Sequence, residues 1–129
     1  MNTFDDLTDA HLLRADEDYR FSLRLLELEE PAPRWAVAAA FYASIHYLSA
    51  WFWNEHQIVV NNHRHRGRML RSGDFDALSP IVESYEYLYR KSLESRYQPA
   101  FSISSSEVDD LLRTDLESIR NLINRELQR

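Results

Sequence analysis

The stretch WAVAAAFYASIHYLSAWFW, residues 35–53, is the longest apolar-rich segment of the chain and decides its fold class. Apolar side chains occur all around a helix of this sequence, which is typical of a central buried helix. The many alanines are small enough to let neighbouring helices pack closely against it. Because Ser44, His46 and Ser49 interrupt the segment, we interpret it as a core helix and not as a membrane span.

Periodicity and helix-end signals place three further helices around this segment. Leucine and aromatic residues recur at helical spacing before it, and the Pro31–Pro33 segment ends that first helix because proline cannot donate a backbone hydrogen bond. A serine followed by a proline, at Ser79-Pro80, predicts the start of a third helix. Ser104 and Glu107 form a capping box that opens the last helix. The four predicted helices cover residues 8–29, 34–55, 79–96 and 104–127.

The length and composition fit one domain over residues 1–129. Of the 129 residues, 44% are apolar and 28% are charged, which is enough to bury a hydrophobic core. No segment alternates as a strand would. The expected fold class is therefore all-α: an antiparallel bundle of about four helices plus a short helix or loop between the second and third. That connection covers residues 57–76, with a short helix around residues 66–71.

Several protein classes are excluded by composition. The chain has no cysteine, so it is not a disulfide scaffold and has neither a thiolate zinc site nor thiol catalysis. Its start, Met1–Asp6, is acidic and polar and lacks both the basic and the apolar region of a signal peptide. We therefore expect a cytoplasmic protein with no membrane segment.

The segment His56–Gly73 is the strongest functional feature, because it contains no acidic residue although the net charge of the chain is −6. Arginine presents a planar fork that matches phosphate oxygens, so four arginines on one glycine-containing loop can clamp a nucleic-acid backbone or a nucleotide phosphate. The alternative is a solvated loop whose arginines pair with acids of the first and last helices. The candidate phosphate-binding residues are Arg64, Arg66, Arg68 and Arg71.

Two histidines of the same loop are candidate catalytic residues. His63 and His65 titrate near neutral pH and can act as acid and base on an RNA 2′-hydroxyl, while a neighbouring arginine stabilises the charge that develops on the phosphate. Metal binding by these histidines together with His56 is disfavoured, because the nearby arginines repel a cation. We expect neither a metal ion nor a cofactor.

Aromatic residues and one further histidine have more than one interpretation. His46 is expected to be a satisfied core histidine, with a position in a dimer groove as the alternative. Trp51, Phe52 and Trp53 cannot all face one core, so at least one is expected to face a partner subunit or a groove. Four tyrosines could stack on bases, but filling a core or an interface is favoured for them. They are Tyr85, Tyr87, Tyr89 and Tyr97.

Several short motifs resemble those of a known family when they are taken in order. An alanine-rich helix with an aromatic pair, a small residue and a histidine occupies Ala39–Leu48. The motifs that follow it are at His65–Arg68, Leu88–Arg90, Glu94–Tyr97 and Ser105–Glu107. From Trp35 to Leu127 the chain resembles the HEPN family of helical bundles, which is found in bacterial toxin–antitoxin and defence proteins.

The resemblance implies a homodimer, since family members commonly place their site in a cleft between two subunits. Many members are metal-independent ribonucleases, with a signature in which an arginine is followed, after four to six residues, by a histidine. That signature is missing here. The nearest string begins at Arg120-Asn121, and Arg125 stands where the histidine would be, so it is a candidate degenerate motif. Arg96 stands where the family has an acid before its tyrosine.

Two functions follow from these patterns. The first is that of a HEPN-like protein that binds RNA or nucleotide phosphate through the basic loop. The missing signature leaves ribonuclease activity open. The second is that of a noncatalytic dimeric interaction module that docks on a partner protein such as a nucleotidyltransferase.

Overall fold

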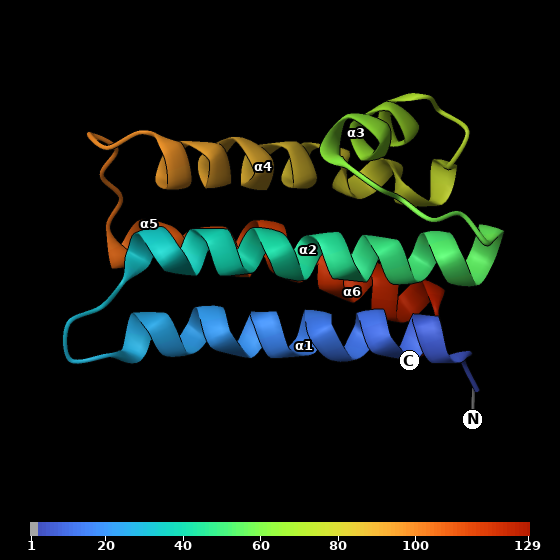
Figure 1. Cartoon of the computed structure of the whole chain (residues 1–129), viewed down its shortest axis with the longest axis horizontal. Helices are drawn as coiled ribbons and strands as arrows, with labels where there is room; N and C mark the ends of the chain where they lie inside the picture. The colour runs from blue at the N-terminus through green and yellow to red at the C-terminus, as the bar shows by residue number, and fades with distance from the viewer. Residues whose placement is uncertain (1–2) are drawn as a thin grey trace.

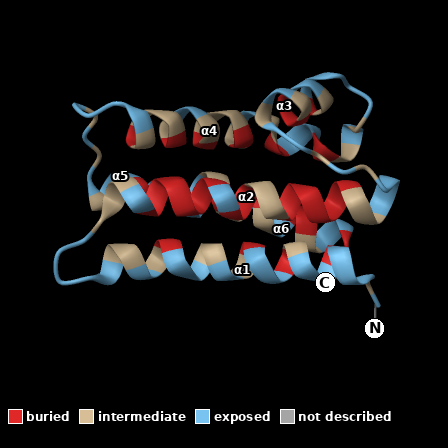
Figure 2. Ribbon diagram, viewed as in Figure 1, coloured by how far each residue is buried: buried red, intermediate tan, exposed pale blue. Residues whose placement is uncertain are grey.

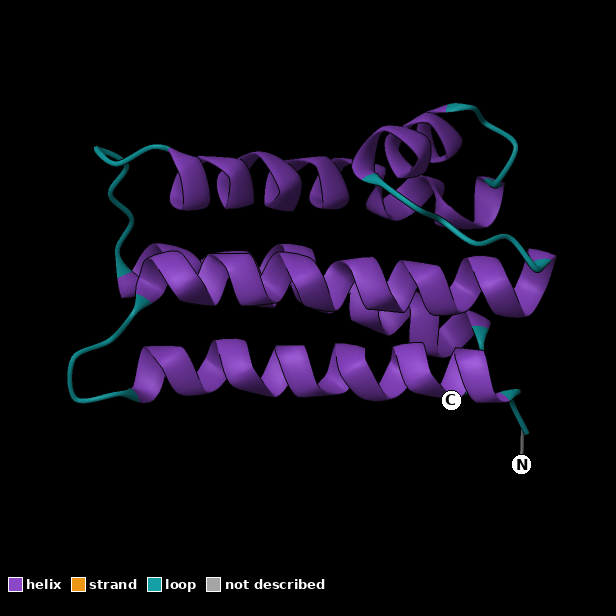
Figure 3. Ribbon diagram, in the orientation of Figure 1, coloured by secondary structure: helices purple, strands orange, loops and turns teal. Residues whose placement is uncertain are grey.

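The computed structural model describes residues 3–129, and every regular element in that range is helical (Figure 3). The all-α fold class predicted from the sequence is therefore confirmed. In chain order the elements are α1 (Asp6–Glu27), α2 (Pro33–His56), α3 (His63–Arg71), the 3₁₀ helix η1 (Asp76–Ile81), α4 (Val82–Tyr97), α5 (Ser105–Leu111), the π-helical turn η2 (Leu112–Leu116) and α6 (Glu117–Glu126).

The helix α2 forms the centre of the bundle, as its composition predicts. In Figure 1, α1, α2 and α4 lie side by side and α5 and α6 lie behind α2, with successive long helices running in opposite directions. α2 contacts all four of these helices. Its buried surface (Figure 2) includes Phe41, Tyr47 and Phe52, which have no exposed area. None of the helices in residues 3–129 is both long and apolar enough to cross a membrane.

The helix α1 begins two residues before its predicted start, because Asp5 caps it. The Asp5 carboxylate accepts a hydrogen bond from the backbone N of Thr8 at 2.9 Å and another from Nε1 of Trp53 at 2.7 Å. Asp5 therefore joins the first turn of α1 to the last turn of α2. α1 ends at Glu27, and Pro33 lies in the first turn of α2, where a missing N–H breaks no helical hydrogen bond.

The three consecutive aromatic residues of α2 all have partners within the chain. Trp51 and Phe52 are buried, and the ring of Phe75 packs edge-on against both, with centroid distances of 6.0 and 5.1 Å. Trp53 bonds to Asp5. The connection after α3 brings Phe75 back onto α2, and these contacts account for all three aromatic residues without a second subunit.

The predicted helix start at Ser79 is wrong. Ser79 and Pro80 lie inside η1, and neither η1 nor α4 has a side-chain cap. Leu78 and Ile81 are almost fully buried, so this turn packs into the core before α4 begins. Burial of these two side chains thus outweighs the local capping signal of a serine followed by a proline.

The start of the last helix is confirmed, but its continuity is not. Ser104 Oγ accepts from the backbone N of Glu107 at 3.1 Å, and Glu107 Oε1 accepts from the backbone N of Ser104 at 3.3 Å. The predicted single helix is interrupted by η2, whose wider turn shifts the register of the helix. Leu112, Leu116 and Ile119 are all buried as a result.

Candidate functional site

The basic segment between α2 and η1 is a loop that contains a nine-residue helix, α3, over residues 63–71, so the predicted loop is wrong only for residues 63–65. The side chain of Asn62 accepts a hydrogen bond from the backbone N of His65 at 2.8 Å and caps α3. α3 contains the predicted short helix over residues 66–71 and begins three residues before it. In a helix, residues three or four apart share a face and residues two apart do not. The helix therefore divides the predicted cluster between two faces.

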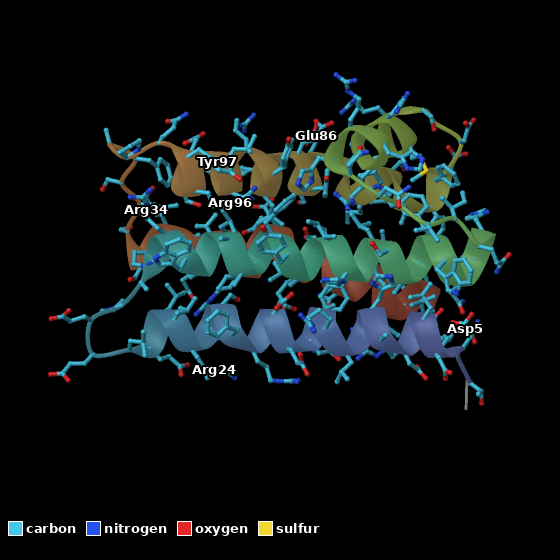
Figure 4. All side chains as sticks on the ribbon, in the orientation of Figure 1. Asp5, Arg24, Arg34, Glu86, Arg96 and Tyr97 are labelled. Atoms are coloured by element: carbon cyan, nitrogen blue, oxygen red, sulfur yellow. The ribbon has the colours of Figure 1, made fainter. Side chains whose placement is uncertain are left out.

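Three of the four predicted phosphate-binding arginines share the outward face of α3. Arg64, Arg68 and Arg71 are exposed. Arg71 lies 3.3 Å from Glu86 of α4, which is labelled in Figure 4, and this exposed ion pair contributes little stability. Within residues 3–129, no carboxylate lies within ion-pair distance of Arg64 or Arg68. Their guanidinium groups are therefore available to a ligand.

The fourth arginine, Arg66, points into the protein. It is only 4% exposed. Its Nη1 donates to the hydroxyl of Tyr85 at 3.2 Å and lies 2.9 Å from Nδ1 of His63. Its Nε has no hydrogen-bond partner, and no carboxylate of the described residues neutralises its charge. Arg66 therefore belongs to the interior contact of α3 with α4 and not to the outward face.

His63 lies in an aromatic setting beside Arg66. Its ring stacks on Tyr89 with a centroid distance of 4.8 Å and lies 5.2 Å from the ring of Phe41. Burial, together with the positive charges of Arg66 and Arg96, lowers the pKa of His63. The imidazole is therefore neutral near pH 7, with Nδ1 accepting a hydrogen bond from Arg66 and the ring proton on Nε2.

The two candidate catalytic histidines are not brought together. His65 lies two residues after His63 and so projects from a different face of α3. The structure instead pairs His63 with Arg66. A catalytic role for either histidine stays a prediction.

A groove is formed mainly by residues of α1 and α2, and we call it the α1–α2 groove. Its volume is about 510 Å³, which is within the range of small-molecule sites. Its polar lining comes from three helices and consists of Arg14, Asp18, Tyr42, His46 and Arg96. Sequence reasoning missed Arg14 and Asp18, although their four-residue spacing predicts one shared face of α1.

Arg96 is the cation that α4 contributes to the α1–α2 groove. Its Nη1 donates to the hydroxyl of Tyr42 at 3.2 Å, and its guanidinium carbon lies 5.6 and 5.0 Å from the ring centroids of Tyr42 and Tyr97. Figure 4 shows Arg96 between α4 and α2. No carboxylate of residues 3–129 forms an ion pair with it. Arg34 donates to the carbonyl of Ser95 at 2.9 Å, which holds this end of α4 against α2.

His46 is half-buried and contacts a second histidine that sequence reasoning missed. Its Nδ1 lies 3.0 Å from Nδ1 of His11 on α1, so one ring donates and the other accepts, and at least one of them is neutral. Burial, followed by the charges of His11, Arg14 and Arg66, lowers the pKa of His46 to about 4. His46 is therefore hydrogen-bonded, as predicted, but lies in a groove and not deep in the core.

The candidate degenerate motif lies on α6. Arg120 stacks over the ring of Tyr19 at 4.8 Å and lies 3.6 Å from Glu117, while Asn121 and Arg125 are exposed. Figure 1 places α6 and α3 on different sides of α2. The structure therefore does not bring this string together with the basic helix.

The tyrosines of α4 mainly make contacts within the chain. Tyr85 is 1% exposed, and Tyr89 stacks on His63. Only Tyr97 is largely exposed among the four, at 69%. In the part of the chain that the structure describes, no group of three or more histidine and acidic side chains is placed to hold a metal ion.

In comparisons with known proteins, no family model and no curated protein matches the chain. Two features of the structure bear on function: the outward face of α3 and the α1–α2 groove.

Proposed function

We propose that this is a HEPN-like protein of a bacterial toxin–antitoxin or defence system that binds RNA or nucleotide phosphate through the outward face of α3. One observation carries the proposal. Arg64 and Arg68, one helical turn apart, present exposed guanidinium groups that no carboxylate of the described residues neutralises. Such a group is free to donate two parallel hydrogen bonds to phosphate oxygens. Arg71 extends the row, because its exposed bond to Glu86 is weak.

The distribution of charge along the chain favours α3 as the site of this binding. The net charge is −6, so most of the surface repels a polyanion. The segment from His56 to Gly73 contains four arginines and no acidic residue. An RNA strand is therefore directed to the outward face of α3 and away from the acidic helices.

Binding is tested with a fluorescently labelled single-stranded RNA and the double variant Arg64→Glu/Arg68→Glu. The matched control is Arg20→Glu/Arg24→Glu, which makes the same change in net charge on the exposed surface of α1. We expect at least about tenfold weaker binding for the α3 variant and a much smaller loss for the control, because phosphate contacts dominate such affinities. Equal losses in both variants would mean that only net charge matters, and the proposal would be wrong.

Cleavage of RNA is the second part of the proposal, with His63 as the proton acceptor. The imidazole accepts a proton on Nδ1 once its hydrogen bond from Arg66 opens, because a guanidinium only donates and that bond occupies the free lone pair of the ring. The test is incubation of the purified protein with a mixed RNA pool in EDTA, beside His63→Gln and His65→Gln. Loss of cleavage in His63→Gln alone supports this role. No cleavage by the folded wild-type protein would refute the ribonuclease part and leave the binding part in place.

The second candidate function is a noncatalytic module that docks on another copy or on a partner protein. The observation in its favour is that α1 and the residue after it expose large apolar side chains. Leu7, Leu13 and Leu28 are 38%, 60% and 50% exposed. Light scattering tests the homodimer: a mass twice that of the chain supports it, and a monomer at every concentration refutes it.

A further inference from the structure

The α1–α2 groove has two chemically different ends. Its apolar side chains are Phe21 and Leu25 of α1 and Trp35, Ala38 and Ala39 of α2. On antiparallel helices these residues share one end, because the bond between His11 and His46 fixes the register at the other. From Trp35 to His46 the helix rises about 16 Å. The groove is therefore long enough for an elongated small molecule.

The other end of the groove is positively charged. Arg14 and His46 line it, and the guanidinium of Arg96 reaches the groove beside Tyr42. Arg14 forms an exposed ion pair with Glu17 at 3.6 Å, whereas Arg96 has no acidic partner among the described residues. The charge of the buried Arg66 also reaches this end, since it lowers the pKa of His46. The single carboxyl group of the groove, Asp18, interacts with the charge of Arg14. Arg96 is the cation of the groove that no carboxylate of the described residues pairs with. An anionic group is attracted to this end.

We propose that the α1–α2 groove binds a small monocarboxylate with an apolar body. The carboxylate pairs with Arg96 and Arg14, and the body lies along Trp35 and Phe21. Trp35 is 65% exposed, so covering its ring removes a large apolar area from water. This site uses none of the outward arginines of α3, so it is independent of the proposed RNA binding.

The same geometry disfavours two other classes of ligand. A nucleotide carries ribose hydroxyls that would lie against Phe21, Leu25 and Ala38, whose side chains offer no hydrogen-bond partner. A neutral apolar molecule would fill the groove but leave the guanidinium of Arg96 without an anion. The apolar lining of the groove and the unpaired charge of Arg96 together favour a ligand with an apolar chain or ring and one negatively charged group.

The test compares three probes that share one body: 4-phenylbutyrate, 4-phenylbutanol and 4-phenylbutylamine. The ¹⁵N-resolved indole signals of the tryptophans report binding. Trp35 lines the groove, whereas the indole N–H of Trp53 bonds to Asp5 outside it and serves as an internal control. We expect a saturable shift of the Trp35 signal with the carboxylate, about tenfold weaker binding of the alcohol and none of the amine. In the series hexanoate, octanoate, decanoate, affinity should rise about two- to fourfold per CH₂.

A matched pair of variants locates the carboxylate. Arg96→Gln removes one of the two charges but keeps a donor near Tyr42, so it should reduce the advantage of the carboxylate over the alcohol and leave the alcohol affinity unchanged. Arg20→Gln, on the exposed surface of α1, should change neither affinity. Unshifted signals of Trp51 and Trp53 in the free variant confirm that it is folded.

Four results would overturn the proposal. The first is no shift of the Trp35 signal at millimolar carboxylate. The second is equal affinity for the amine and the carboxylate. The third is tighter binding of AMP than of 4-phenylbutyrate, which would make the groove a nucleotide site. The fourth is a Trp35 signal that responds to no probe while light scattering gives a dimer, which would mean that a second copy covers the groove.

Discussion

The guanidinium of Arg66 lies 2.9 Å from Nδ1 of His63, on the inner face of α3. Both residues come from the basic segment, yet Arg66 is almost fully buried and faces the protein. It acts on His63 through its charge, because burial and the charges of Arg66 and Arg96 together lower the pKa of that histidine. The inner face of α3 therefore lowers the pKa of His63, and its outward face is open to a ligand.

Replacing the buried guanidinium should raise the pKa of His63. In Arg66→Met the nearest positive charge is removed, so protonation of the imidazole becomes easier. An NMR titration of the His63 ring measures the change. The variant Arg68→Met, on the outward face, is the control and should leave the pKa of His63 in place. An unchanged pKa of His63 in Arg66→Met would contradict the effect of the Arg66 charge on His63.

His46 should make the protein less stable as the pH falls from about 6.5 to about 4. In the folded state its pKa is about 4, against an ordinary value of 6.5, so between these values the unfolded chain binds more protons. His11 and His63 act in the same direction, since their pKa values are also lowered. Thermal unfolding between pH 7.5 and 4 measures the effect.

The variant His46→Gln isolates this contribution. Its melting temperature should fall less steeply than that of the wild type between pH 6.5 and 4, because one of the titrating groups has been removed. His65→Gln, the same substitution on α3, is the control. If the melting temperatures of the wild type and His46→Gln fell equally with pH, the lowered pKa of His46 would be contradicted.

Gly67→Ala should stabilise the protein by about 0.5–1 kcal/mol, because alanine is the better helix former in the middle of α3. The added Cβ would lie 2.9 Å from Nη1 of Arg71. That group is the end of a flexible side chain, held only by an exposed pair with Glu86, so it can move away at little cost. Urea denaturation measures the change. A loss of stability would show that Arg71 is fixed where it lies.

The features that the sequence predicts well are local ones. Residues 35–53 are apolar on every side, and only a central helix can bury such a surface. The Ser104–Glu107 capping box depends on two side chains in one turn. The π-helical turn was missed because it depends on how Leu112 and Leu116 pack against α2 and α4, and no local pattern records that contact.

In the candidate site, too, only the local features could be predicted from the sequence. The positive charge of the four arginines is visible in the sequence. Which of the arginines face outward depends on where α3 begins, and the cap at Asn62 sets that start. His11 and His46 are 35 residues apart and meet only because α1 and α2 are antiparallel. Arg96 joins the groove through a bond to Tyr42 from another helix. These contacts belong to the tertiary fold.

The salt dependence of RNA binding tests the central claim, the phosphate-binding face of α3, most directly. The association constant for a single-stranded RNA is measured against salt concentration for the wild type and for Arg64→Gln/Arg68→Gln. Each phosphate contact to a single strand adds about 0.7 to the slope of the logarithmic plot, so the variant should lose about 1.4. Weaker binding with that smaller slope is the predicted result. An unchanged slope in the folded variant would contradict the assignment of RNA binding to α3.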